Sequence, residues 1–249
     1  MKTGGISLKN INFSYKNPKY SVNTSNLIIF EDFNINFPPS KVSVILGPSG
    51  CGKSTLLNII HGILIPSSGI IEKDKNSTIS YIFQEPRLLP WKTVRQNIDL
   101  ILKNHYEHKQ RQVITKHYLE IIGLNEFADY YPTELSGGMR QRVAIARAFA
   151  YPAEIILMDE PFQALDPGLK LNLTKLFSSL WREDNRTSLF VTHDIAEAVY
   201  LGDEIYVLSS KFPSKIVDHI SNHVPRTNRL SSNPEYKKIE TRLFSLLTN

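Results

Sequence analysis

The chain has 249 residues, of which 41% are hydrophobic and 21% are charged, the balance of an ordinary globular protein. Its single cysteine, Cys51, excludes a disulfide-stabilised scaffold and favours a reducing compartment. The longest apolar run, near Leu56 to Ile65, is about ten residues and contains Asn58 and His61, whereas a membrane span needs about 20. We therefore expect no membrane-spanning helix.

The net charge of +5 is concentrated near the C-terminus. From Lys211 onward there are seven Lys/Arg and three Asp/Glu residues, which leaves the rest of the chain nearly neutral. A basic protein can bind nucleic acid or a membrane surface, but this distribution favours a solvated basic face on the tail. Met1 to Gly5 lead into no apolar stretch, so we expect no secretory signal.

The N-terminal region predicts short strands, because apolar residues alternate with polar ones in Ile6 to Phe13. Asn17 to Asn26 predicts a hairpin loop. Val42 to Leu46 is a mostly apolar, β-branched run that predicts a buried strand, and a helix is expected from Lys53 to about Ile63.

The chain changes character between Gln84 and Tyr151, where apolar residues recur at helical spacing and predict a helical insert. The other predicted strands are Ile79 to Phe83, Ile155 to Met158, Ser188 to Val191 and Ile205 to Leu208. A helix with one apolar face is expected around Leu169 to Leu180. Strands that alternate with helices predict an α/β fold with a parallel sheet.

The basic tail is expected to form a docked amphipathic helix rather than a disordered arm. Asn233 and Pro234 are typical of an N-cap followed by proline at the first helical position. Ile239, Leu243 and Leu246 then continue at helical spacing.

A phosphate-binding loop is predicted directly after the first buried strand, by the pattern G-x-x-x-x-G-K-[ST]. Small residues let backbone N–H groups surround a phosphate chain, and the following helix points its positive end at that chain. Lys53 is expected to reach the β- and γ-phosphates, and the Ser54 hydroxyl to ligate Mg²⁺. Cys51 is interpreted as a small loop residue, with a redox or nucleophilic thiol as the alternative. The predicted nucleotide-binding residues here are Gly47, Pro48, Ser49, Gly50, Cys51, Gly52, Lys53, Ser54 and Thr55.

Two carboxylates end the apolar strand at Ile155 to Met158. Asp159 is predicted to bind Mg²⁺ through water. Glu160 is predicted to accept a proton from the attacking water, as a general base.

A second anion-binding helix N-terminus is predicted at Leu135, Ser136, Gly137, Gly138 and Met139. One nucleotide does not need two such ends from one chain. The segment therefore favours a head-to-tail homodimer, in which each ATP lies between the phosphate loop of one subunit and this segment of the other. The alternative is a plain glycine-rich helix start.

Taken together, these motifs resemble the ATP-binding subunit of an ABC transporter over nearly the whole chain. The resemblance implies a P-loop NTPase core with a parallel sheet, an N-terminal antiparallel β subdomain and the helical insert. It implies one domain over residues 1–249, with a helical subdomain at about 84–151 and a C-terminal extension at about 211–249.

The resemblance also implies further site residues. Tyr15 would stack on adenine, and Gln84 would touch Mg²⁺ and link the core to the helical insert. Asp166, in Ala164-Leu165-Asp166, would lie in the loop that crosses the dimer seam. His193 would contact the γ-phosphate and orient the attacking water. The implied catalytic residues are thus Glu160, His193 and Lys53, and the implied Mg²⁺ ligands are Ser54, Gln84 and Asp159.

Three segments resemble the group that serves nitrate, sulfonate, taurine and pyrimidine-precursor importers: Arg87 to Val94, Glu160 to Phe162, and Val224 to Arg226. Gln163, where the group usually has a small residue, and His61, where it usually has alanine, depart from the pattern. Gly69 to Gln84 is interpreted as a short hairpin.

Further parts of the machine follow from the family resemblance. They are ATP and Mg²⁺, two integral-membrane permease subunits and, through them, an extracytoplasmic solute-binding protein. The chain would be peripheral, on the cytoplasmic side of the inner membrane. The permease contact is expected at Leu88 to Trp91, an apolar run that suits a groove for a partner helix; the alternative is that Trp91 packs inside the helical insert.

Other classes of ATPase are weighed as alternatives. A soluble ABC-type ATPase acting on DNA or ribosomes is disfavoured, because the stretch between Ser54 and Leu135 cannot hold a long coiled coil and the chain has one cassette. A P-loop kinase would not need the Leu135 to Gly138 segment, and no nucleic acid is expected as a partner. An exporter subunit is a further alternative, but exporters often fuse membrane spans to this domain.

Overall fold

The computed structural model describes residues 4–16, 26–163, 165–229 and 231–248, so most of the predicted loop Asn17 to Asn26 lies outside the described residues. The chain forms two compact units. The first comprises the described residues up to Ser77 and those from Thr187 onward, and the second is Thr78–Arg186. The expected single-domain organisation stays a prediction.

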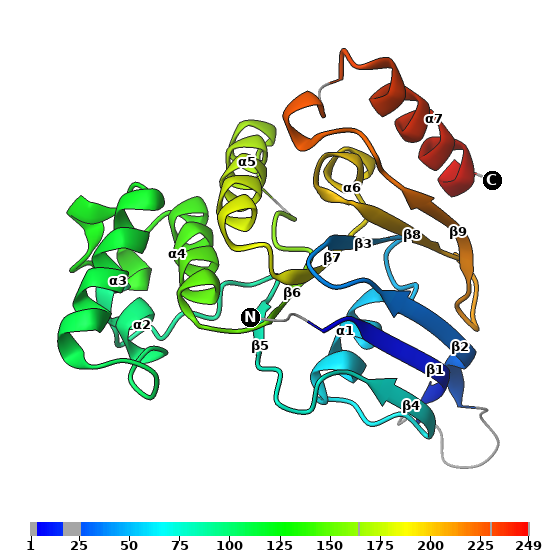
Figure 1. Cartoon of the computed structure of the whole chain (residues 1–249), viewed down its shortest axis with the longest axis horizontal. Helices are drawn as coiled ribbons and strands as arrows, with labels where there is room; N and C mark the ends of the chain where they lie inside the picture. Colours follow the sequence, from blue (N-terminus) through cyan, green and yellow to red (C-terminus); the bar gives the residue numbers. More distant parts are fainter. Residues whose placement is uncertain (1–3, 17–25, 164, 230, 249) are drawn as a thin grey trace. The chain divides into compact units, whose positions relative to one another are not determined.

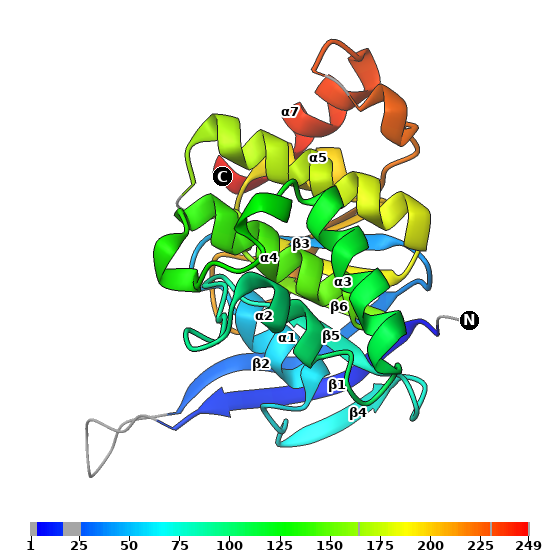
Figure 2. The same ribbon diagram turned by 90° about the vertical axis from the view of Figure 1, so that its left-hand side faces the viewer.

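The first unit contains two sheets. Strands β1 (Ile6–Tyr15), β2 (Leu27–Phe37) and β4 (Ser68–Glu72) form an antiparallel sheet in the order β2-β1-β4 (Figures 1 and 2). Its buried residues alternate along β1, as the sequence pattern predicted.

The second sheet of this unit has the order β7-β3-β8-β9. Strands β3 (Val42–Leu46), β7 (Thr187–Thr192) and β8 (Glu204–Leu208) are parallel, and β9 (Ile216–Ser221) runs antiparallel to β8. The three parallel strands are buried along their whole length, which explains why they read as continuous apolar runs rather than as alternating ones.

Helices α1 (Lys53–His61), α6 (Ile195–Leu201) and α7 (Pro234–Thr248), with the short 3₁₀ turn η3 (Arg226–Asn228), complete the first unit. Asn233 caps α7 through its side-chain oxygen, and the buried Tyr236 and Leu243 pack the helix beside α6 (Figure 1). The prediction of a docked C-terminal helix is confirmed.

The second unit pairs the parallel strands β5 (Ile79–Ile82) and β6 (Ile155–Asp159) and is otherwise helical. Its helical elements are α2 (Val94–Leu100), α3 (His108–Ile121), η1 (Asn125–Phe127), η2 (Pro132–Glu134), α4 (Gly137–Ala150) and α5 (Pro167–Asp184). All but α5 lie between β5 and β6, which is the stretch predicted to be helical.

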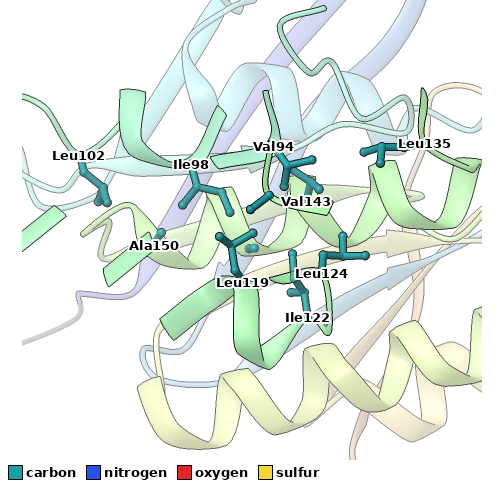
Figure 3. Close-up of a cluster of buried hydrophobic side chains, with 11 residues drawn as sticks. Val94, Ile98, Leu102, Leu119, Ile122, Leu124, Leu135, Val143 and Ala150 are labelled. Atoms are coloured by element: carbon teal, nitrogen blue, oxygen red, sulfur yellow. The ribbon is translucent and has the colours of Figure 1, made fainter. Parts of the chain in front are cut away.

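A hydrophobic cluster holds α2, α3 and α4 together (Figure 3). Figure 3 shows the side chains of Val94, Ile98, Leu119 and Val143 directed toward one another from three helices. Leu135 belongs to the same cluster, so the core of this unit also anchors the chain just before α4.

One expected hairpin is wrong. β4 pairs with β1 in the antiparallel sheet, whereas β5 pairs in parallel with β6. The segment from Gly69 to Gln84 therefore connects strands of two different sheets. The strand pattern was visible in the sequence, but it does not specify the partner of each strand.

The described residues contain no helix that is both long and apolar enough to cross a membrane.

Candidate nucleotide-binding site

The phosphate-loop sequence joins β3 to α1 in the first unit. The helix begins at Lys53, as predicted. The Lys53 side chain is 3% exposed, and its ammonium donates hydrogen bonds to the backbone oxygens of Gly47 and Pro48, each at 2.9 Å. This cation is therefore held against the loop, at the end of α1 where the helix dipole also favours an anion.

Glycine is required within the loop for conformational reasons. Gly50 and Gly52 have φ angles of +82° and +96°, and a Cβ on Gly52 would lie 2.9 Å from Ile29 Cγ2. Cys51 is 2% exposed, and its backbone oxygen accepts a hydrogen bond from the Ser214 hydroxyl at 2.6 Å. This buried position favours a small structural residue over a reactive thiol.

The first turn of α1 connects the loop to the predicted adenine-stacking residue. Ser54 is exposed, whereas Thr55 is buried and its hydroxyl lies 3.2 Å from the hydroxyl of Tyr15. The Tyr15 residue is 41% exposed and its ring packs edge-on against Phe13 at 5.0 Å. Tyr15 is thus fixed beside α1, with part of its surface exposed.

His193 follows β7 and lies beside the start of the phosphate loop. The parallel register of β3 and β7 places Leu46 opposite Thr192, and the Gly47 amide donates to the Thr192 oxygen at 3.3 Å. His193 itself is exposed. The first unit therefore brings the phosphate loop and His193 together, because the carboxyl ends of the parallel strands β3 and β7 meet at one edge of a sheet. Tyr15 reaches the same loop from the antiparallel sheet, through its contact with Thr55.

In the second unit, Asp159 is the last residue of β6 and Glu160 follows it with a φ of +43°. The left-handed conformation is uncommon for a non-glycine residue and is often found at functional sites. Tyr81 of β5 donates its hydroxyl hydrogen to Asp159 Oδ2 at 3.5 Å. Burial, together with this carboxylate, raises the pKa of Tyr81 well above its usual value, so Tyr81 remains a neutral donor.

Gln84 follows β5, and its side chain forms a hydrogen bond with the side chain of Gln163. Gln163 follows β6 and is the residue that departs from the small residue usual in the importer group. The backbone N–H of Gln163 donates to the backbone carbonyl oxygen of Glu160 at 3.1 Å. Sequence reasoning missed the contact between the two glutamines, because they lie 79 residues apart and no local pattern links them. The parallel pairing of β5 with β6 brings them together.

The other departure, His61, lies at the opposite end of α1 from the phosphate loop. Burial and the neighbouring Lys73 lower the pKa of His61, which favours its neutral form. Lys73 donates to the Ile60 oxygen at 3.1 Å, where a cation complements the helix C-terminus.

The Ser136 segment opens α4, as predicted. Ser136 is the N-cap, and its hydroxyl accepts a hydrogen bond from the Met139 amide at 3.2 Å. Gly137 is exposed, whereas a Cβ on Gly138 would overlap the Leu169 side chain of α5. The segment is therefore a rigid, exposed helix N-terminus.

Asp166 caps α5 by accepting a hydrogen bond from the Leu169 amide at 3.0 Å. Pro167 occupies the first helical position, which suits its fixed φ and missing N–H. Ala164, the first residue of the predicted seam loop, lies outside the described residues.

Comparison with known proteins gives consistent results. Residues 30–163 match the ABC transporter family model. The chain is 42% identical to the aliphatic sulfonates import ATP-binding protein of Bacillus subtilis, over 87% of this chain and 86% of that protein. It is 37% identical to the nitrate import ATP-binding protein of Synechocystis, over 89% and 88% of the two chains.

Solved structures lead to the same fold. A dimeric ATP-binding cassette in a post-hydrolysis state, bound to ADP and phosphate, matches with a TM-score of 0.75 and 32% identity. The match covers 88% of this chain and 99% of that one.

Proposed function

Because the chain belongs to the ABC transporter family, we propose that it is the ATP-binding and ATP-hydrolysing subunit of an importer for a small solute. The observation that carries the proposal is the buried Lys53 ammonium, held against the loop by Gly47 and Pro48 at the start of α1. The 42% identity to a sulfonate import subunit over most of both chains supports the importer role.

In this proposal, the nucleotide phosphates bind to the loop from Gly47 to Gly52 and to Lys53, Ser54 and Thr55, while Tyr15 stacks on adenine. Ser54, Gln84 and Asp159 present hydroxyl, amide and carboxylate oxygens, the hard donors that Mg²⁺ prefers. When bound there, Mg²⁺ would neutralise charge on the phosphates.

Glu160 and His193 have separate tasks in hydrolysis. The Glu160 carboxylate accepts the proton of the attacking water, and His193 contacts the γ-phosphate and orients that water. Lys53 stabilises the charge that develops on the transferred phosphate.

Two copies of the chain form the working ATPase. The exposed N-terminus of α4, with Leu135, Ser136, Gly137, Gly138 and Met139, binds the ATP of the partner subunit, and Asp166 lies at the seam. The dimeric, ADP- and phosphate-bound cassette of 32% identity supports this arrangement. ATP closes the dimer and hydrolysis reopens it.

Leu88 to Trp91 form the contact with the permease. Trp91 is 68% exposed, so it does not pack inside the helical insert, whereas Leu88 packs against the hydrophobic cluster. A large exposed aromatic side chain on a firmly packed base suits a partner helix. Two permease subunits would hold the ATPase on the cytoplasmic side of the inner membrane and link it to an extracytoplasmic solute-binding protein.

The solute is proposed to be a sulfonate, nitrate or a thiamine-pyrimidine precursor. Uptake of labelled candidates by cells with and without the gene tests this proposal, with a Lys53→Ala strain as the matched control. We expect uptake of one class to be lost in both the deletion and the Lys53→Ala strain. Unchanged uptake of all three classes, with a different solute lost, would overturn the solute assignment alone.

A further inference from the structure

Glu197 carries a buried carboxyl group and follows His193, the predicted γ-phosphate contact, closely in the chain. The residue is 6% exposed and lies in the first turn of α6. Glutamate is seldom buried to this extent unless its carboxyl group is hydrogen-bonded, since desolvation is costly. Glu197 belongs to none of the predicted nucleotide-binding segments, so its burial has another cause.

The Thr192 hydroxyl donates a hydrogen bond to Glu197 Oε2 at 2.5 Å. The same hydroxyl accepts a hydrogen bond from the Asp194 amide at 3.0 Å. A hydroxyl has one hydrogen, so its donation to Glu197 directs a lone pair toward Asp194. Glu197 is therefore linked, through the Thr192 hydroxyl, to the residues on both sides of His193.

Thr192 also belongs to the phosphate-loop side of the site. It is 2% exposed, lies opposite Leu46 in the parallel register, and accepts the Gly47 amide at its backbone oxygen. Thr192 thus joins the start of the phosphate loop to the His193 segment. The contact with Gly47 uses the Thr192 backbone oxygen, so a change in the Thr192 hydroxyl acts on the His193 side and leaves this contact in place.

Asp194 anchors the other side of His193. Its carboxylate caps α6 by accepting hydrogen bonds from the Ala196 amide at 2.8 Å and the Glu197 amide at 3.2 Å. His193 therefore lies between Thr192 and Asp194, and both of these residues form hydrogen bonds to Glu197 in the first turn of α6. Thr192 bonds to the Glu197 carboxyl group, and Asp194 bonds to the Glu197 amide.

We propose that Glu197 is a positioning residue for ATP hydrolysis, which holds Thr192 and thereby His193 without touching the nucleotide. This inference rests on the proposed ATPase function. It predicts that loss of the Thr192–Glu197 hydrogen bond lowers turnover while ATP binding is retained, because the phosphate loop itself keeps its own contacts.

The test compares purified Glu197→Leu, Glu197→Gln and Thr192→Val in steady-state ATPase assays, with thermal unfolding measured in parallel. We expect Glu197→Leu to lower kcat about tenfold with KM for ATP unchanged, which corresponds to about 1.4 kcal/mol, within the range for one hydrogen bond. Glu197→Gln keeps an acceptor oxygen and should recover most of the turnover. Thr192→Val removes the same bond and also the acceptor of the Asp194 amide, so it should lower kcat at least as much as Glu197→Leu. Combining the two should cost little more than Thr192→Val alone.

Tyr236→Phe, on α7, is the matched control for a hydrogen bond to α6. The Tyr236 hydroxyl donates to the Ala196 oxygen at 3.4 Å, so the variant removes a different hydrogen bond to the same helix. We expect its kcat to equal the parental value.

Parental kcat in Glu197→Leu, or a raised KM with kcat unchanged, would overturn the positioning role. If Glu197→Leu does not fold, parental kcat in folded Thr192→Val would overturn it equally. Failure of the proposed function is a separate outcome, because the parental protein would then hydrolyse no ATP.

Discussion

The two units hold their candidate functional residues in different ways. In the first unit, backbone groups fix the functional residues. Lys53 donates hydrogen bonds to two backbone oxygens of the loop, and the register of β3 and β7 sets the position of His193 beside the start of that loop. In the second, Ser136 and Asp166 also bond to backbone amides, but Gln84 meets Gln163 through exposed side chains and Trp91 is largely exposed. Backbone-held groups are preorganised for a ligand of constant shape, whereas exposed side chains can change partners. We therefore expect the first unit to bind the nucleotide phosphates and the second to change its contacts during the ATPase cycle.

Lys53→Ala provides the strongest test of whether the first unit binds the nucleotide phosphates. It removes the buried cation from the phosphate loop, so we expect ATPase activity to fall about 100-fold or more in steady-state assays. Lys73→Ala is the matched control, because Lys73 bonds to a backbone oxygen at the other end of the same helix. Near-parental turnover in folded Lys53→Ala would contradict the phosphate-loop assignment.

Glu160→Gln tests whether the second unit controls reopening. We expect ATP binding to persist while hydrolysis falls by about 10²–10⁴, the typical contribution of a general base. The closed dimer should then accumulate with Mg-ATP in size-exclusion chromatography. Glu154→Gln is the control: Glu154 accepts bonds from Thr78 next to the start of β6 and should not trap a dimer. A Glu160→Gln protein that stays monomeric with ATP bound argues against the assignment.

Trp91→Ala should separate hydrolysis from transport. The side chain is largely exposed, so its loss should leave the fold and basal ATPase activity intact while solute uptake is lost. Leu88→Ala removes a side chain that packs on the cluster and should instead lower the unfolding temperature. Unchanged uptake in Trp91→Ala cells would place the permease contact elsewhere.

The smallest expected effect concerns stability in the first unit. Burial raises the pKa of Glu204, but hydrogen bonds from Lys41, Ser221 and His219 outweigh burial and lower it below the ordinary value of 4.5. A carboxyl group whose pKa is lowered by folding stabilises the native state above its unfolded pKa, and this contribution is lost as the pH falls through the folded pKa.

Glu204→Gln should therefore lower the free energy of unfolding by about 1.5–3 kcal/mol at pH 7, the range for hydrogen bonds to charged groups. Urea titrations at pH 7 and below pH 4 measure this difference, which should shrink at the lower pH. A difference independent of pH would mean that charge on Glu204 does not contribute.

Much of the fold could be predicted from local patterns. The buried strand Val42–Leu46, the helix start at Lys53 and the caps Ser136 and Asn233 depend on residues close together in the chain, and all were identified. The partner of β4 could not be predicted, because a strand's period does not encode its neighbour.

The local structure around the candidate site was predictable to the same extent. The phosphate loop and the Ser136 segment are each a run of consecutive residues, so each run by itself predicts anion binding. The Gln84–Gln163 contact joins residues from different strands, and the burial of Glu197 depends on how α6 packs. Such features arise from tertiary structure and have no signature in a single sequence.

The burial of Cys51 within the phosphate loop gives the protein a chemical reporter of its own. It is the single cysteine of the sequence, and its side chain is covered in the folded loop. A thiol-labelling reagent can therefore reach the sulfur only when this segment opens locally. The labelling rate measures how often the loop opens. Ligands that bind to the loop should lower this rate in proportion to their occupancy, and no engineered cysteine is needed.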